Sequence, residues 1–116
     1  MKFILVFVGG GLGSVVRYTI SLFFERFAVQ FPLATLISNF LACLILISLT
    51  VVLIKENEFQ FIQPLLIIGF CGGFSTFSTF SLDTIQLIQN GQIIIAILNV
   101  LISVLSCLGI IYFLSK

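Results

Sequence analysis

The stretch that decides the fold is Gly72-Gly73-Phe74-Ser75-Thr76-Phe77-Ser78-Thr79-Phe80-Ser81, because it interrupts a run that is otherwise apolar enough to cross a membrane. Two of its residues are glycine and five carry a hydroxyl group. Hydrocarbon offers no partner to a free backbone N–H or C=O, so a broken helix persists at membrane depth only where it is buried in protein or lines a polar cavity. The stretch therefore predicts a helix break that forms a site of hydroxyl donors, backbone dipoles and aromatic edges. Such a set suits a solute path better than an enzyme.

The composition of the whole chain is that of a membrane protein. Hydrophobic residues make up 60% of the 116 positions and charged residues 8%, whereas about a quarter of the residues in a soluble domain are charged. We expect a single transmembrane domain over residues 1–116. The net charge is +1 and no basic cluster is present, so nucleic acid is not expected as a partner. Without histidine or a pair of carboxylates, the chain offers no general acid–base chemistry, and no enzymatic activity is expected.

Four apolar segments are long enough to cross a hydrocarbon core of about 30 Å. Short polar connections with helix-stopping residues such as Pro32 and Asn90-Gly91 separate them, as expected between antiparallel neighbours. The first segment follows Lys2 like a secretory signal, but Arg17 and the lack of a clear cleavage site indicate a retained helix. The sequence thus predicts an all-α membrane protein whose third helix is broken mid-membrane, with four transmembrane helices over residues 3–24, 33–54, 61–88 and 93–114.

The distribution of basic residues bears on orientation and assembly. With the N-terminus in the cytoplasm, Lys2, Lys55 and Lys116 lie on that side and Arg26 lies on the other. This bias is small for a rule that works through clusters of basic residues near span ends. Insertion in both orientations, which would give an antiparallel dual-topology homodimer, and a single orientation set by the weak bias are both open. Because four spans enclose little interior, an oligomer is favoured.

Two features of the first span are informative. Gly9 and Gly13 form a Gly-x-x-x-Gly pair that allows close helix packing, within or between subunits. Arg17 lies inside the span, where a charge costs at least about 2.5–3.5 kcal/mol unless it reaches the interface or a polar cavity. It is either a residue that extends to the headgroups or a fixed positive charge at an anion vestibule. Asp83, the only acid inside a span, is its candidate partner.

Polar residues of the second and fourth segments fall on single helix faces. Asn99, Ser103 and Ser106 are spaced i, i+4, i+7, and Thr35 and Asn39 are spaced i, i+4. An asparagine amide has two donors and an acceptor to satisfy, so it is harder to place in hydrocarbon than a lone hydroxyl. The pattern favours one convergent polar path that includes the hydroxyl-rich break, with separate packing contacts as the alternative.

The inventory of groups indicates the charge of the solute. A cation path is expected to present carboxylates or rings of carbonyls, whereas this chain embeds an arginine, amides and hydroxyls, which are donors and suit an anion. Phe77 and Phe80, three apart on one helix face, could contact an anion with their positive ring edges. Core packing is the alternative for any phenylalanine in a chain that has 14 of them. A narrow path favours a small, strongly hydrated anion.

The three cysteines are Cys43, Cys71 and Cys107, which lie far apart in apolar runs. A disulfide framework or a cysteine metal site generally has closer or even spacing. We therefore expect them to be small residues of the core.

Three stretches resemble the signature stretches of the CrcB/Fluc fluoride channel family in order, spacing and four-span layout. They are GGLGSVVRY at 10–18, TLISN at 35–39 and GFCGGFSTFSTFS at 69–81, of which the third is the most specific. The resemblance implies a passive channel that exports cytoplasmic fluoride and confers fluoride resistance. It also implies a bacterial plasma (inner) membrane location, in contact with lipid, and an antiparallel dual-topology homodimer with two pores.

The resemblance assigns pore roles to individual residues. Phe77 and Phe80 match the phenylalanines that flank the ions, and Asn39 matches the pore asparagine of the second helix. Ser78 and Thr79 match hydroxyls beside the pore.

Other assignments concern the ends and the centre of the path. Arg17 matches the arginine of the first stretch and is placed at the vestibule. By motif position, the carbonyls of Gly72 and Ser75 match those that hold a structural sodium ion at the dimer interface. Asn99 and Ser103, from the stripe on the fourth helix, complete the candidate pore residues.

The main alternative function is a small multidrug-type proton-coupled exporter, which also has four spans and similar length. That mechanism uses a titratable carboxylate, typically in the first helix, and aromatic residues that hold a cation. Here the first span has Arg17 and no acid, and the chain has no tryptophan. A structural membrane subunit without transport is a further alternative, against which the polar break weighs.

Overall fold

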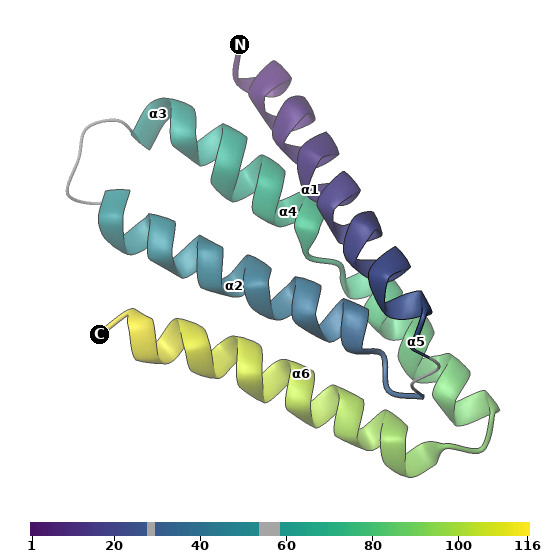
Figure 1. The fold of residues 1–116 in the computed structure, drawn as a ribbon. Helices are drawn as coiled ribbons and strands as arrows, with labels where there is room; N and C mark the ends of the chain where they lie inside the picture. Colours follow the sequence, from purple (N-terminus) through teal and green to yellow (C-terminus); the bar gives the residue numbers. More distant parts are fainter. Residues whose placement is uncertain (28–29, 54–58) are drawn as a thin grey trace.

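The computed structural model describes residues 1–27, 30–53 and 59–116, and every regular element in these ranges is a helix. The four long apolar stretches fold as expected, while the third is divided into shorter pieces, of which η1 is a π-helix (Figure 1). The elements are α1 (Lys2–Glu25), α2 (Leu33–Leu53), α3 (Phe59–Ile62), η1 (Gln63–Cys71), α4 (Gly72–Phe74), α5 (Phe77–Gln89) and α6 (Ile93–Leu114).

Four helical stretches are long and apolar enough to cross a membrane: Lys2–Glu25, Leu33–Val52, Gln60–Gln89 and Ile93–Leu114. They confirm the four predicted segments to within two residues, except that Ile54 and the polar connection at 55–58 lie outside the described residues. Only 11–17% of the residues in the most apolar window of each span are buried inside the chain. Most of their apolar surface is therefore available to lipid or to another subunit.

The third span is broken near its centre, as predicted. The helix that starts at Phe59 ends at Phe74, and α5 begins at Phe77. Between them Ser75 (φ −84°, ψ 152°) and Thr76 (φ −152°, ψ 120°) are extended. Thr76 is the residue immediately before α5, a position that favours threonine because its hydroxyl accepts a hydrogen bond from a backbone N–H of the first turn. Here that donor is Thr79.

The helices form a thin bundle in which α6, α2, the first half of the third span and α1 lie side by side in that order (Figure 1). The second half of the third span, α5, packs against α6. Its extents are 51 × 31 × 20 Å. The four long stretches alternate in direction, and both termini lie toward the same end of the bundle, as an even number of spans requires (Figure 1). A bundle this thin has a small core, which includes Ala42, Ile47, Phe74 and Ala96.

The Gly-x-x-x-Gly pair of α1 is used for packing within the chain. A Cβ atom added at Gly9 would meet the carbonyl oxygen of Leu65, and one added at Gly13 would meet that of Phe70. From the other side, a Cβ at Gly73 would meet the backbone of Gly10. Small residues on both helices let the backbones of α1 and the first half of the third span touch, as in other membrane helix pairs.

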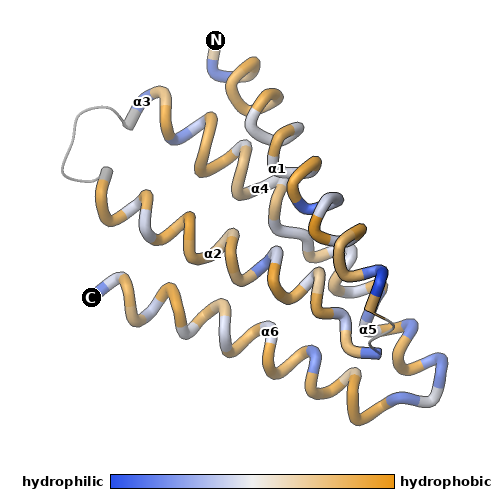
Figure 2. The backbone as a smooth tube through the Cα atoms, viewed as in Figure 1, coloured by the Kyte–Doolittle hydropathy of each residue, from blue (hydrophilic) through white to orange (hydrophobic). Residues whose placement is uncertain are grey.

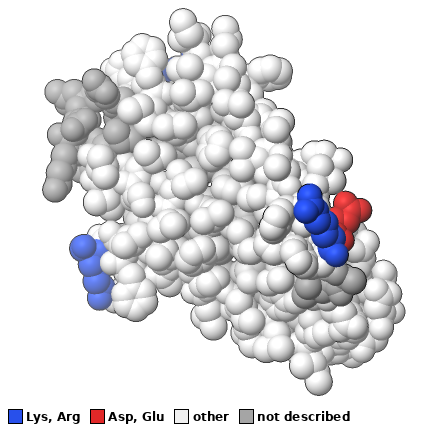
Figure 3. Space-filling view, viewed as in Figure 1, with Lys and Arg blue, Asp and Glu red and all other residues white. Residues whose placement is uncertain are grey.

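Polar residues are sparse along the helices. Figure 2 shows hydrophobic residues along most of each long helix, with hydrophilic ones at the connections and at a few positions inside the spans. On the face drawn in Figure 3, charged atoms lie toward the edges and uncharged atoms cover the middle. Two polar side chains of other spans, Arg17 and Asn39, reach the backbone at the break.

Candidate functional site

Asn39 of α2 holds the backbone of the break through both ends of its amide. Its Oδ1 accepts a hydrogen bond from the backbone N–H of Thr76 at 2.8 Å, and its Nδ2 donates to the carbonyl of Thr76 at 3.3 Å. In a continuous helix the same N–H would donate to the carbonyl of Gly72. The side chain therefore replaces helical partners that the extended residue has lost, as a membrane setting requires.

Thr76 is also the centre of a hydroxyl cluster at the start of α5. Its Oγ1 accepts from the backbone N–H of Thr79 at 3.2 Å and lies 3.0 Å from Oγ of Ser78 and 3.3 Å from Oγ1 of Thr79. The predicted site residues Ser78 and Thr79 thus lie around Thr76, which was not among the predicted site residues. A threonine three residues before another hydroxyl at a helix start is the signal that could have found it.

Arg17 contacts the break and not Asp83. Its Nε donates to the carbonyl of Gly73 at 3.1 Å, so the guanidinium satisfies a carbonyl near the end of α4. Asp83 Oδ2 instead accepts from Oγ1 of Thr35 at 2.7 Å. The candidate pairing of Arg17 with Asp83 is therefore wrong, because packing of α1 against η1 and α4 brings Arg17 to a different partner. Thr35 shares a face of α2 with Asn39, as predicted, and both contact the third span.

The two phenylalanines of the break lie next to each other. The ring centroids of Phe77 and Phe80 are 5.7 Å apart with an angle of 37° between the ring planes. Phe77 is 78% exposed and Ser78 is exposed, whereas Phe80 is half-buried. The aromatic ring of Phe77 and the hydroxyl of Ser78 are thus both exposed, on adjacent residues near the centre of a span.

Two residues of the polar stripe of α6 are buried inside the chain. Asn99 is 1% exposed and Ser103 is 5% exposed. Ser103 Oγ donates to Asn99 Oδ1 at 3.3 Å, Asn99 Nδ2 donates to Thr84 Oγ1 at 2.9 Å, and Thr84 Oγ1 donates to the carbonyl of Phe80 at 2.8 Å. This relay joins α6 to the backbone that carries Phe80. Ser106, the third member of the stripe, donates to the carbonyl of Ser103 at 3.3 Å.

One buried hydroxyl of α2 has no hydrogen-bond partner in the described part of the chain. Ser38 is fully buried, and its Oγ makes no hydrogen bond within the described ranges. It lies next to Asn39 in sequence but on a different side of α2, because successive helical residues are separated by about 100°.

Gly72 and Ser75 present backbone carbonyls that the break has released. The N–H of Thr76, which would reach Gly72 in a regular helix, goes to Asn39. A Cβ at Gly72 would meet no atom within 4 Å, so this carbonyl-bearing residue lies at an open surface. Ser75 donates both its N–H, at 2.9 Å, and its hydroxyl, at 2.8 Å, to the carbonyl of Cys71. The N–H of Thr79, which would reach the carbonyl of Ser75 in a regular helix, goes to Oγ1 of Thr76 instead.

The cysteines are not paired as disulfides. Cys43 and Cys71 line one cavity of about 170 Å³ together with Gly72 and Ser75. Within the described parts of the chain, no group of three or more His, Cys, Asp or Glu side chains is arranged to hold a metal ion.

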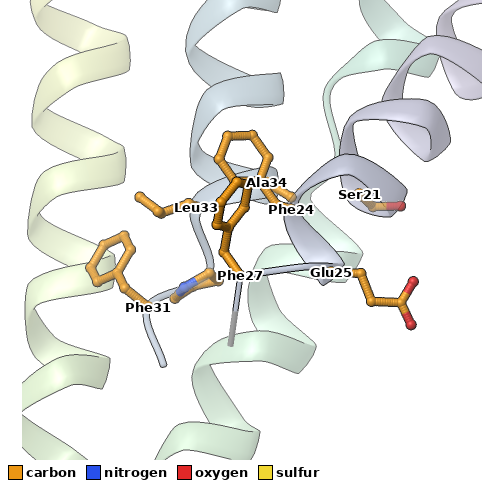
Figure 4. A pocket seen from close by; sticks show the side chains of 8 residues that line it. Ser21, Phe24, Glu25, Phe27, Phe31, Leu33 and Ala34 are labelled. Atoms are coloured by element: carbon orange, nitrogen blue, oxygen red, sulfur yellow. The ribbon is translucent and has the colours of Figure 1, made fainter. Parts of the chain in front are cut away.

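Two pockets lie near the end of α1 and α5, away from the break. One, of about 240 Å³, is lined mainly by aromatic and aliphatic side chains, including Phe24, Phe27 and Phe31 (Figure 4). The other, of about 470 Å³, is polar and contains Asp83 together with the amides of four residues: Gln30, Gln86, Asn90 and Gln92. The polar pocket is large enough to hold water near the C-terminal end of α5.

Four long apolar helices, with a broken third span whose polar groups are satisfied by α1 and α2, define a multi-pass membrane protein. The chain belongs to the family described as CrcB-like protein, Camphor Resistance (CrcB), whose model matches residues 4–114. It is 40% identical over 112 residues to "Fluoride-specific ion channel FluC" of Coxiella burnetii, which covers 94% of this chain and 90% of the relative. It is 42% identical over 99 residues to the protein of the same name from Flavobacterium psychrophilum, covering 84% of this chain and 80% of that one.

Proposed function

We propose that this chain is a fluoride-selective passive ion channel that exports fluoride from the cytoplasm and confers fluoride resistance. The observation that carries the proposal is the broken third span, where Asn39 and Arg17 hold the freed backbone and leave the hydroxyls and phenylalanines of Thr76–Phe80 beside it. The groups concentrated there are donors and positive ring edges, which suit an anion. The related proteins named above are fluoride-specific channels, not enzymes.

The physical basis for export is simple. Hydrogen fluoride is a weak acid that crosses membranes as a neutral molecule and dissociates in a near-neutral cytoplasm, where the anion is trapped. A negative-inside potential favours exit of an anion by about 2.3 kcal/mol per charge per 100 mV. A selective passive path in the bacterial plasma membrane is therefore sufficient, and no energy source or proton-coupling carboxylate is needed.

The active assembly in this proposal is an antiparallel dual-topology homodimer. Support comes from the thin bundle, the small buried share of every span and the open surface at Gly72 and Phe77. A second copy related by a two-fold axis would cover these residues, and the weak bias of basic residues allows both orientations. Two copies together would enclose ion paths that a single copy cannot shield from lipid. The 116 residues form one domain in this arrangement.

A structural sodium ion fits the centre of such a dimer. The carbonyl oxygens of Gly72 and Ser75 are hard ligands, and the two-fold axis would supply each of them twice. The break leaves the Gly72 carbonyl without its helical donor, and the surface there is open. When bound, sodium would neutralise the freed carbonyl dipoles and join the two copies. If so, replacing sodium with a large organic cation should lower flux and weaken the dimer.

The proposed path uses the residues around the break. Phe77 and Phe80 would turn ring edges to the ion, and Ser78 and Thr79 would replace its water. Asn39 keeps one N–H after its contacts with Thr76, because an amide nitrogen has two hydrogens.

Of the remaining path residues, one would act at the vestibule and two would act by holding the backbone that carries Phe80. Arg17 uses Nε for Gly73 and retains its other N–H groups for an anion at the vestibule. Asn99 and Ser103 are buried in this chain and would contribute by holding the carbonyl of Phe80 through Thr84.

Growth of a fluoride-sensitive bacterium tests the proposal. Expression of this chain should restore growth in medium with fluoride and make no difference to resistance against cationic drugs. Resistance to cationic drugs without resistance to fluoride would instead support the proton-coupled exporter. Of these two functions the channel is favoured, because α1 has no acidic residue before Glu25 that could serve for proton coupling.

A further inference from the structure

The start of α5, which carries Phe77 and Phe80, is held by α2. Asn39 binds the backbone of Thr76 through both ends of its amide, and α5 begins at the next residue. This contact fixes where α5 starts but leaves its direction open. A second contact, one turn beyond Phe80, comes from α6.

The second contact runs from a buried amide of α6 to the backbone of Phe80. Asn99, which is 1% exposed, donates from Nδ2 to Thr84 Oγ1 at 2.9 Å. Thr84 Oγ1 donates in turn to the carbonyl of Phe80 at 2.8 Å. Because an amide nitrogen only donates, the threonine hydroxyl accepts from it and turns its own hydrogen to the carbonyl. Each hydrogen bond therefore sets the direction of the next.

The contact also determines which rotamer Thr84 adopts. Threonine in a helix divides between two χ1 rotamers, because its hydroxyl can bond a carbonyl of the preceding turn. Thr19 and Thr50 make this kind of bond to the carbonyl four residues earlier in their own helices. Thr84 differs because its hydroxyl also accepts from a second helix. A local bond thus becomes a connection between α5 and α6.

Apolar packing beside this connection is incomplete. A cavity of about 230 Å³ runs between α5 and α6 and is lined by Thr84 and by aliphatic side chains of both helices, such as Ile88 and Val100. Where such space remains, apolar contacts constrain two helices less than in a closely packed interior. The bond from Asn99 to Thr84 is also the one side-chain hydrogen bond that joins α5 to α6 in the described part of the chain. It is therefore the main constraint on the position of α5 at this level.

We propose that Thr84 is a positioning residue for ion passage, which joins the backbone of Phe80 to α6 so that the rings of Phe77 and Phe80 are held between one contact on α2 and one on α6. The inference rests on the proposed function, in which these rings face the ion. The exposed ring of Phe77 has little packing of its own to hold it, so its place depends on the backbone of α5. Chloride is larger than fluoride, and a path of fixed width excludes the larger anion. Loss of the Thr84 hydroxyl should therefore reduce discrimination against chloride.

Release of fluoride and of chloride from liposomes by full-length variants tests this role. Thr84→Val removes the hydroxyl but keeps the branched shape, and it should lower the ratio of fluoride to chloride release about tenfold, the change in rate that corresponds to one lost hydrogen bond. Thr84→Ser keeps the hydroxyl and should retain the parent ratio. Thr50→Val removes the same kind of local bond on α2 and is the matched control, which should also retain it. A parent-like ratio in Thr84→Val, or an equal loss in Thr50→Val, would overturn the proposal.

A double variant separates positioning from stability. Thr84→Val alone leaves the buried amide of Asn99 without its acceptor, which lowers the free energy of unfolding. Thr84→Val combined with Asn99→Leu removes both partners, and Ser103 is then free to bond the carbonyl of the preceding turn. Stability should return toward the parent value, while the ratio of fluoride to chloride release should stay as low as in Thr84→Val. A ratio that recovers together with stability would show that the bond serves folding alone and would overturn the positioning role.

Fluorine NMR of the full-length protein, with para-fluorophenylalanine in place of Phe80, reports the surroundings of this ring without any ion flux. The resonance should shift in Thr84→Val and keep its parent position in Thr84→Ser. An unshifted resonance in Thr84→Val would contradict the connection between Thr84 and the ring. A protein that shows the shift but conducts fluoride in no variant, the parent included, would retain this connection and refute the proposed function.

Discussion

Asn39 and Thr76 are joined by two hydrogen bonds that run in opposite directions, from the Thr76 N–H to Oδ1 at 2.8 Å and from Nδ2 to the Thr76 carbonyl at 3.3 Å. One side chain of α2 thus satisfies both backbone groups of an extended residue inside the third span. The pairing explains how a helix can be interrupted among apolar helices without leaving these groups unpaired. It also fixes the position at which α5, with Phe77 and Phe80, begins.

Asn39→Asp should damage both the break and the path. The change removes the donor to the Thr76 carbonyl and, if ionised, adds a negative charge to an anion route. We expect fluoride flux to fall at least about tenfold, which corresponds to a barrier higher by about 1.4 kcal/mol. Loss of this partly buried bond should also lower the free energy of unfolding, by about 1 kcal/mol. Asn90→Asp, at an exposed turn, is the control and should leave both flux and stability near the parent values.

Phe80→Ile should impair fluoride flux while the dimer still forms. Isoleucine keeps apolar bulk but has no positive ring edge to offer an anion. The comparison is Phe113→Ile on α6, where the ring is 73% exposed and distant in sequence from the break. Flux from liposomes, with gel filtration to verify assembly, gives the measurement. Equal flux in the two folded variants would remove the phenylalanine from the proposed path.

Gly13→Ala should destabilise the chain, whereas Gly11→Ala should not. A Cβ at Gly13 would meet the backbone of Phe70 and Phe74, but one at Gly11 would meet no atom within 4 Å. Overpacking of this kind costs about 1–3 kcal/mol, while alanine at an open helical position favours the helix by roughly 0.5–1 kcal/mol over glycine. Thermal unfolding in detergent should separate the two variants. Similar melting temperatures would mean that α1 does not pack on the third span as described.

A tag on one terminus should be labelled from both sides of the membrane. The expectation follows from the small bias of basic residues and from the proposed antiparallel dimer. Cysteine labelling of a tagged chain in intact cells, followed by labelling after permeabilisation, should reveal two populations of similar size. Labelling from one face alone would contradict dual topology.

The spans could be predicted from the sequence because length and hydropathy along one segment are sufficient to identify them. The break could be predicted for a similar reason, since its glycines and hydroxyls are adjacent in the chain. The partner of Arg17 could not, because it depends on which face of α1 packs against η1 and α4. The same holds for Thr76 as the group bound by Asn39. Each of these joins residues that only the tertiary arrangement brings together.

The most direct test of the account is the efflux of ions from liposomes that contain only this protein. Vesicles loaded with potassium fluoride, with valinomycin present to carry the counter-charge, should release fluoride rapidly, as read by a fluoride electrode. Vesicles loaded with potassium chloride should release far less in the same time. This result would support a passive, fluoride-selective path through the break. Absence of fluoride release by correctly assembled protein, or equal release of chloride, would contradict it.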